Sequence, residues 1–205
     1  MVITFIKSIL QRLYPYGECR VGKAVYLTFD DGPIPEVTPG VLDILARYGV
    51  KATFFMVGEN IDKHPDVFRR VLEEGHTVAN HSYNHIKGFR YTTSAYLANV
   101  SKCQNAIERH GGQTRLFRPP YGRTFWWQRR ALVERGYRII LWDVLTRDYN
   151  PRRTPEEMLS QVKRETRPGS IINFHDSLKS NERMLKVLPR VIEWLQKEGY
   201  EIKAL

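Results

Sequence analysis

The sequence has little cysteine and no long apolar run. Its 205 residues contain two cysteines, Cys19 and Cys103. That is too few for the disulfide framework of a small secreted domain, and their spacing fits no zinc knuckle. We expect two free thiols, with a single bridge between them as the alternative. These features exclude a disulfide-stapled scaffold and leave the redox compartment open.

Targeting and nucleotide-binding signals are also missing. The apolar start, residues 1–6, is interrupted by Lys7 and is followed by no small-residue cleavage site. It is too short for a membrane span and does not match a cleavable signal peptide. No GxGxxG follows the first predicted strand, and no GxxxxGK[ST] occurs anywhere in the chain. A transmembrane protein, a dinucleotide-binding protein and a P-loop enzyme are therefore not expected.

What the sequence does contain is enough apolar material for one folded domain. Hydrophobic residues make up 42% and aromatic residues 12% of the chain, which excludes a disordered or collagen-like protein. Lys and Arg number 32 against 22 Asp and Glu, a net charge of +10. That surplus fits either a basic soluble surface or a patch for nucleic acid, anionic membrane or an acidic polymer.

Residues 1–22 are predicted to form an amphipathic arm ahead of a single domain at 23–205. Apolar residues recur at helical spacing, with Lys7, Gln11 and Arg12 off their face: Val2, Ile3, Phe5, Ile6, Ile9, Leu10 and Leu13. Such a helix either caps the domain or lies on a membrane surface through residues 1–13. Without a cleavable signal, we expect the protein in the cytoplasm or at the inner membrane face.

From Lys23 onward, short apolar strands alternate with amphipathic helices. The expected strands are 24–29, 52–57, 76–80, 114–117, 138–144, 170–174 and 201–205. The expected helices are 37–48, 65–74, 94–110, 126–135, 155–165 and 183–198, with Thr154 as an N-cap. This alternation predicts an α/β fold with a parallel sheet and outer helices. A distorted (β/α) barrel of about seven strands is favoured over an open sheet.

Polar residues that can do chemistry follow five of the predicted strands. They are Asp30 and Asp31, His81 and His85, the segment from Arg118 to Gly122, Asp143 and Asp148, and His175 and Asp176. The carboxyl ends of parallel strands meet on one side of the sheet, where active sites of (β/α) barrels lie. We therefore expect these side chains to gather at one site.

Two histidines and an aspartate form a candidate metal site. His81 and His85 are four residues apart, so on a helical turn both imidazoles would share a face. Asp31 supplies an acidic third ligand, and a His₂-Asp set with open positions is typical of a catalytic site for a divalent ion. Zinc is expected, with cobalt or nickel as alternatives. In an extended segment Asp30 would point elsewhere and could accept a proton from a water that the ion activates.

The remaining polar residues complete a hydrolytic site. His175 is a candidate general acid, oriented by Asp148 or, as a second choice, by Asp143. Arg118 would neutralise the acidic cluster. Because Pro119 and Pro120 stiffen the loop, the backbone N–H of Tyr121 could donate to an oxyanion. The alternatives without a catalytic role are a surface turn for residues 30–33, a hydrogen-bonded core histidine for His175 and a surface salt bridge for Arg118.

Taken together, these motifs resemble those of the NodB-homology polysaccharide deacetylases, also called carbohydrate esterase family 4. The matching segments run in the family's order: TFDDGP at 28–33, HSYNH at 81–85, RPPYG at 118–122, the stretch 142–149 and IINFHD at 171–176. The resemblance implies a distorted (β/α) barrel and metal-dependent removal of acetyl groups from a glycan. It implies Asp30 as base, Asp31, His81 and His85 as metal ligands, and His175 as acid. It further implies that Arg118 organises the carboxylates and that the Tyr121 backbone donates to the oxyanion, while Asp148 matches the aspartate of the fourth motif.

Two positions depart from the family's pattern. Tyr149 stands where a tryptophan is usual and would wall the pocket, and Asn173 stands where an aliphatic residue usually lines the acetyl pocket. The polar Asn173 opens an alternative, a deformylase or amidohydrolase of a small or lipid-linked substrate. A non-catalytic glycan-binding or nucleic-acid-binding module is a remote alternative, because base, ligands and acid are all present. We expect an acetylated saccharide and no nucleic acid as partner; oligomeric state is not predicted.

Overall fold

The structure is a computed structural model that describes residues 22–205. Its centre is a sheet in which every strand pairing is parallel, ordered β5-β4-β3-β2-β1-β7-β6, with β8 beside β1. The strands are β1 (Ala24–Asp30), β2 (Thr53–Met56), β3 (Thr77–Asn80), β4 (Leu116–Phe117), β5 (Arg138–Ile139), β6 (Val144–Leu145), β7 (Ile171–His175) and β8 (Glu201–Lys203). Within the described residues the outer strands β5 and β6 do not pair, so the barrel stays incomplete. The predicted distorted barrel is confirmed.

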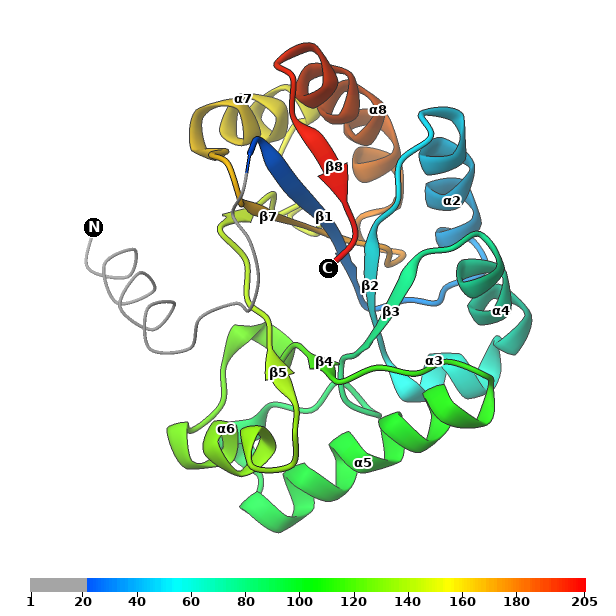
Figure 1. Ribbon diagram of the computed structural model, residues 1–205, viewed down its shortest axis with the longest axis vertical. Coiled ribbons are helices and arrows are strands. Elements are labelled where there is room, and N and C mark those ends of the chain that lie inside the picture. Colours follow the sequence, from blue (N-terminus) through cyan, green and yellow to red (C-terminus); the bar gives the residue numbers. More distant parts are fainter. Residues whose placement is uncertain (1–21) are drawn as a thin grey trace.

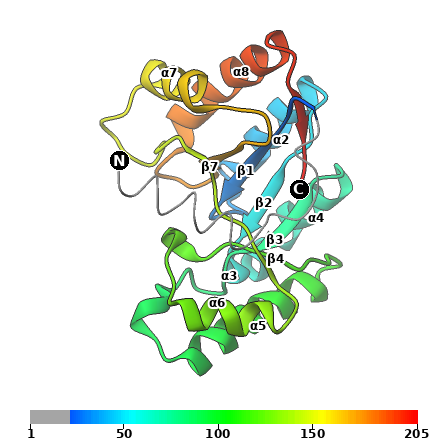
Figure 2. The same ribbon diagram turned by 60° about the vertical axis from the view of Figure 1, so that its left-hand side comes forward.

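Helices surround this sheet and cover its outer face (Figure 1). They are α2 (Thr38–Arg47), α3 (Gly58–Lys63), α4 (Pro65–Glu73), α5 (Thr93–Arg109), α6 (Trp126–Val133), α7 (Pro155–Glu165) and α8 (Asn181–Lys197). Figure 2 shows α7 and α8 at the opposite end of the sheet from α5 and α6. The predicted N-cap is confirmed, because the Thr154 hydroxyl accepts from the Glu157 N–H at 3.2 Å. The Glu157 carboxylate accepts in turn from the Thr154 N–H at 3.0 Å, which completes a capping box.

Alternation along the strands divides the residues between two faces. Val25, Leu27 and Phe29 of β1 join the main core under the helices, together with Phe54 of β2 and Phe174 of β7. The intervening residues face the concave side, where a smaller apolar cluster includes Phe55, Ala79 and Ile171. Because side chains alternate with a period of two, Thr28, Asp30, Asn173 and His175 also belong to the concave side. This periodicity brings polar groups into the barrel.

The predicted strand at 138–144 is wrong in its middle. It forms two short strands, β5 and β6, which lie at opposite edges of the sheet. Between them, the carbonyl oxygens of Ile140 and Leu141 accept hydrogen bonds from the Arg118 guanidinium at 3.2 Å each. A buried arginine from another loop thus binds carbonyls that a neighbouring strand would otherwise bind. Helix α3 was not predicted from the sequence.

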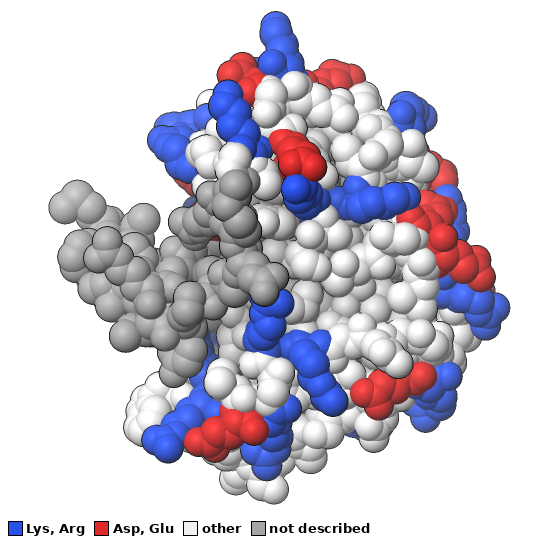
Figure 3. Space-filling model, in the orientation of Figure 1, with Lys and Arg blue, Asp and Glu red and all other residues white. Residues whose placement is uncertain are grey.

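Three sequence-based expectations concern features outside the sheet. Cys103 is a buried free thiol, as expected, whereas Cys19 and the N-terminal arm fall outside the described residues apart from Gly22. None of the helices within residues 22–205 is long and apolar enough to cross a membrane. On the face in Figure 3, basic side chains are spread over the surface and interspersed with acidic ones. On that face, the positive charge forms no single stripe.

Candidate functional site

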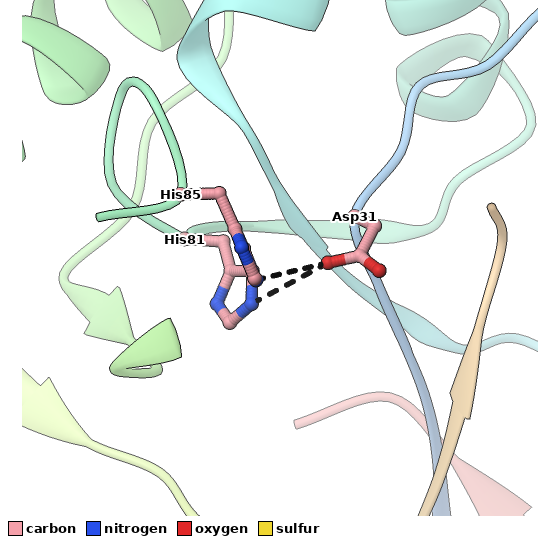
Figure 4. A group of neighbouring side chains, drawn as sticks. All are labelled: Asp31, His81 and His85. Carbon is pink, nitrogen blue, oxygen red and sulfur yellow. Dashed lines mark ion pairs between the residues drawn. The ribbon is translucent and has the colours of Figure 1, made fainter. Parts of the chain in front are cut away.

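Asp31, His81 and His85 meet at the carboxyl ends of β1 and β3, the two strands that flank β2 in the sheet (Figure 4). The Asp31 Oδ1 atom lies 3.2 Å from His85 Nε2 and 3.8 Å from His81 Nε2. One potential ligand atom from each residue lies within 4.8 Å of the others. The structure therefore brings together the three residues that the sequence assigned to a metal site.

The two histidines reach this arrangement from a loop, so the expected helical turn is wrong. They follow β3, and both Ser82 (φ 66°) and His85 (φ 52°) adopt left-handed backbone conformations, as does Asp31 (φ 88°). The two imidazole centroids are nevertheless 5.0 Å apart. Left-handed non-glycine residues are strained and often gather at functional sites, and here Tyr121 and Arg147 are the other two described examples.

Hydrogen bonds and burial prepare the three side chains to hold a cation. His81 Nδ1 lies 2.8 Å from the Arg118 carbonyl oxygen, which fixes a proton on that nitrogen and leaves the Nε2 lone pair toward Asp31. Burial lowers the pKa of His81 to about 4, so the ring is neutral at pH 7. Burial opposes ionisation of Asp31, but the His85 hydrogen bond and the charges of His175 and His81 hold its pKa well below the usual range.

This donor set fits a divalent ion. Two imidazoles and one carboxylate are three protein ligands, which leaves coordination positions for water and substrate. The Asp31 backbone is held in turn, since the Asn60 amide donates to its carbonyl oxygen at 2.8 Å and its own N–H donates to the Phe55 carbonyl. The residues thus agree with the expected metal site, while the identity of the metal stays a prediction.

Asp30 has a different environment, although it precedes Asp31 directly. It is only 2% exposed, and its Oδ1 forms an ion pair with Arg118 Nη1 at 2.6 Å. Its Oδ2 accepts from the Asn173 amide at 2.9 Å. Arg118 Nη1 also donates to Asn173 Oδ1 at 2.5 Å and to the Thr28 hydroxyl at 2.9 Å. Both oxygens of the candidate base are therefore held in place by fixed donors.

Asn173 lies beneath the site and not on its surface. Its side chain has no solvent exposure, and its oxygen accepts from Thr28 and Arg118 while its nitrogen donates to Asp30. Through these hydrogen bonds it positions the Asp30 carboxylate. That it also lines an acyl pocket stays a prediction.

His175 and Asp148 form a second pair at the same edge. His175 Nδ1 and Asp148 Oδ1 are 2.8 Å apart, and the His175 N–H donates to Asp148 Oδ2 at 2.7 Å. Burial lowers the pKa of His175, but the Asp148 charge and hydrogen bond, with Asp30 and Asp31, outweigh it and raise that pKa to about 9. Asp143 accepts from the Ile171 N–H. Of the two candidates, Asp148 is the one that orients His175.

Two exposed tyrosines flank the polar groups. The Tyr121 ring lies 4.8 Å from the His85 ring, and Lys87 Nζ lies 4.7 Å from the Tyr121 centroid. The Tyr149 ring lies edge-on to His175 at 4.9 Å. Tyr121 therefore adjoins the metal-ligand side, and Tyr149 adjoins the candidate acid.

Sequence reasoning missed the part that Asp176 plays. This buried carboxyl accepts from the Gly32 N–H at 3.0 Å and from the Thr38 hydroxyl at 2.6 Å, and burial raises its pKa to about 8. A Cβ on Gly32 would lie 2.0 Å from Asp176 Oδ2, so the position requires glycine. Adjacency to His175 was the only signal; the pairing with Gly32 spans 144 positions.

Comparisons with known proteins agree with this geometry. The family model described as polysaccharide deacetylase matches residues 17–140. A peptidoglycan-N-acetylglucosamine deacetylase of Bacillus cereus is 33% identical over 90% of this chain and 66% of its own length. A chitooligosaccharide deacetylase of a Bradyrhizobium species is 34% identical over 93% of this chain and 92% of its own length.

Solved structures show the same likeness. A peptidoglycan N-acetylglucosamine deacetylase in complex with 4-naphthalen-1-yl-N-oxidanyl-benzamide superposes with a TM-score of 0.88, at 31% identity, over 91% of this chain and 88% of that one. A family 4 carbohydrate esterase pseudoenzyme from Bacillus anthracis has a TM-score of 0.83, at 26% identity, over 91% of this chain and 65% of its own. The chain spans only 38% of a matching Listeria monocytogenes deacetylase.

Proposed function

This chain belongs to the polysaccharide deacetylase family. We propose that it removes acetyl groups by hydrolysis from a glycan that contains N-acetylglucosamine. A divalent ion would assist the reaction, and zinc is the ion we favour. Two features support this proposal. The named relatives deacetylate peptidoglycan or chito-oligosaccharides, and the residues that hydrolysis needs share one edge of the sheet. The acetamide C–N bond would be broken by water, giving acetate and a free amine.

Asp30 accepts the proton of the attacking water. A general base must be ionised and aimed, and this carboxylate is fixed by Arg118 at one oxygen and Asn173 at the other. Its neighbour Asp31, with His81 and His85, would hold the ion, which would supply Lewis-acid polarisation of the acetyl carbonyl and of the water. The Tyr121 N–H is proposed to donate to the carbonyl oxygen as it becomes an oxyanion.

His175 delivers a proton to the departing amine. Its pKa of about 9 keeps the imidazolium protonated at neutral pH, as a general acid requires. Asp148 holds Nδ1 at 2.8 Å, so Nε2 is the nitrogen left to face the leaving group. One proton taken by Asp30 and one given by His175 balance the hydrolysis.

Acetyl is the acyl group that the structure favours. The alternative of a formyl or more polar amide rested on a polar Asn173 in the acyl pocket, and Asn173 contributes no exposed surface. The observation that carries the proposal is the pairing of Asp30, whose two oxygens are both bound, with the neighbouring Asp31–His81–His85 set, in which Asp31 and His85 are partly exposed.

The test is acetate release from peptidoglycan fragments, chito-oligosaccharides and acetylated xylan, measured side by side with zinc and with chelator. We expect chelator-sensitive release from the N-acetylglucosamine polymers that disappears in Asp30→Asn. Release from xylan alone would shift the substrate to O-acetyl groups. If zinc binds and no substrate releases acetate, the proposal fails and the protein joins the pseudoenzymes of its family.

A further inference from the structure

A cluster of exposed aromatic side chains lies beside the site and takes no part in the hydrolysis described above. It consists of Phe89, Tyr91, Phe125, Trp126 and Trp127, which we call the α6 aromatic surface. Trp126 is 67% exposed, the most exposed of the large hydrophobic side chains in residues 22–205. Large apolar side chains gathered on a surface mark an interaction site more often than scattered ones do.

The cluster is held together by a buried glutamine. The Gln128 amide nitrogen donates to the carbonyls of Gly88 and Tyr91 at 3.0 and 3.3 Å, and its oxygen accepts from the Phe125 N–H at 3.1 Å. These bonds join the 88–91 turn to the start of α6. The Phe125 and Trp127 rings stack at 4.3 Å, and Trp126 meets Trp127 edge-on at 5.6 Å. The surface is therefore ordered within the fold.

The charge around this surface is predominantly positive, although Arg130 pairs with Glu134 at 2.8 Å. Residues 86–107 and 111–133, which include both of its segments, contain no Asp or Glu. Five basic residues lie within or beside the aromatic positions: Lys87, Arg90, Arg123, Arg129 and Arg130. Arg90 and Arg123 are exposed. The combination of aromatic rings with basic residues is complementary to an anionic surface.

Among anionic or sugar-like partners, a lipid surface fits best. Carboxylates are common acceptors for sugar hydroxyls, yet both segments lack them, and the Gln128 amide between the rings is used internally. The stacked pair Phe125 and Trp127 covers one face of each ring, which leaves each ring a single face for stacking on a sugar. Trp and Tyr favour the membrane–water interface, and Lys and Arg are attracted to anionic headgroups.

We propose that the α6 aromatic surface docks the protein on an anionic membrane surface, with Trp126 at the centre of the contact. This inference is independent of the proposed catalytic function. The N-terminal sequence has the same chemistry, since residues 1–17 are largely apolar, carry Lys7 and Arg12 and contain no acidic residue. Two such elements together bind a membrane far better than either alone.

Docking there would leave the site at the membrane surface. Tyr121, which contacts His85, lies four positions before Phe125, and Lys87, which contacts Tyr121, lies two positions before Phe89. The aromatic surface therefore borders the metal-ligand side of the site. Helices α7 and α8 lie at the other end of the sheet (Figure 2), away from the contact.

Vesicle flotation of the full-length, chelator-treated protein tests the proposal. We expect binding to vesicles of phosphatidylcholine with phosphatidylglycerol, weaker binding to phosphatidylcholine alone, and loss of binding at high salt. Trp126→Ser should weaken binding to the anionic vesicles about tenfold. Leu178→Ser is the matched control, because Leu178 is nearly as exposed as Trp126, at 65%, but lies after β7 and outside the α6 aromatic surface. Circular dichroism verifies that both variants fold.

Several results would overturn the proposal. Wild-type protein that does not float with anionic vesicles would end it, as would equal losses in Trp126→Ser and Leu178→Ser. If the wild-type protein instead sedimented with insoluble peptidoglycan and Trp126→Ser abolished that, the surface would be a glycan site. Because the flotation uses no metal or substrate, its failure is distinct from failure of the deacetylase assay.

Discussion

Two adjacent carboxylates at the end of β1 have opposite environments. Asp30 is buried, and its two oxygens are bound by Arg118 and Asn173. Asp31 is partly exposed and faces the nitrogens of His81 and His85, the other two candidate ligands. The first carboxylate has its partners within the chain, whereas the second belongs to a set that a cation would complete. Adjacent residues thus belong to two different arrangements: Asp30 to a closed hydrogen-bond network within the chain, and Asp31 to an open candidate metal site.

The backbone explains how neighbours can differ so much. Asp30 is the last residue of β1 and continues its alternation onto the concave face. Asp31 follows the strand in a left-handed conformation. The N–H of the next residue, Gly32, donates to the Asp176 carboxyl. The sheet orients Asp30, and the strained turn orients Asp31. Changes at the two positions should therefore fail in different ways.

The largest effect is expected for Asp30→Asn. The amide still accepts from Arg118 but cannot take a proton, so deacetylation should fall about 10³-fold. Zinc affinity should stay unchanged, because Asp30 is not among the grouped ligands. Acetate release and zinc content, measured on the same preparation, check both parts. A variant that loses its zinc as well would show that the two carboxylates act as one site.

The converse change removes a histidine from the open site. His85→Ala should weaken zinc binding at least about 100-fold, since the effect should exceed that of a lost supporting residue. Metal competition with a fluorescent chelator measures it. His110→Ala is the control, because His110 pairs with Asp62 elsewhere. Equal affinities in the two variants would remove His85 from the ligand set.

The sequence predicts much of this arrangement, and the missing parts have physical reasons. Strand and helix alternation and the polar residues at strand ends follow from local pattern, and they place Asp30, Asp31 and both histidines at one edge. The gap between β5 and β6 does not follow, because Arg118, 22 positions before Ile140, binds the carbonyls there. Asn173 could not be placed from its residue type, since its three partners come from β1 and the Arg118 loop. Such long-range pairings have no local signature.

Asn173→Leu tests how much the finished network contributes to stability. The leucine fits the volume but leaves Asp30 Oδ2 and Arg118 Nη1 each short of a buried partner, which should cost about 3 kcal/mol of unfolding free energy. In metal-free protein His85→Ala should cost less than about 1 kcal/mol, because that side chain is partly exposed. Urea unfolding of both variants gives the comparison. Similar losses of unfolding free energy in the two variants would contradict the distinction between the closed Asp30 network and the open Asp31–His81–His85 site.

A smaller effect per step of the measurement is expected in the pH dependence of stability of metal-free protein. The pKa of His175 is about 9 in the fold against about 6.5 unfolded, so its contribution is complete below pH 6.5 and is lost as the pH rises through 9. The raised pKa of Asp176, about 8, acts in the same direction from about pH 4 to 8. Each group should contribute a slope of about 1 kcal/mol per pH unit within its window.

The two contributions separate by variant and by window. His175→Gln should flatten the stability curve near pH 9, where Asp176 has largely ionised in the fold. Asp176→Asn should flatten it between pH 4 and 6.5, below the window of His175. Urea unfolding at closely spaced pH values resolves these slopes. If Asp176→Asn changed the slope only near pH 9 instead, the carboxyl beneath Gly32 would titrate with the histidine, and the turn that aims Asp31 would not be independent of the acid.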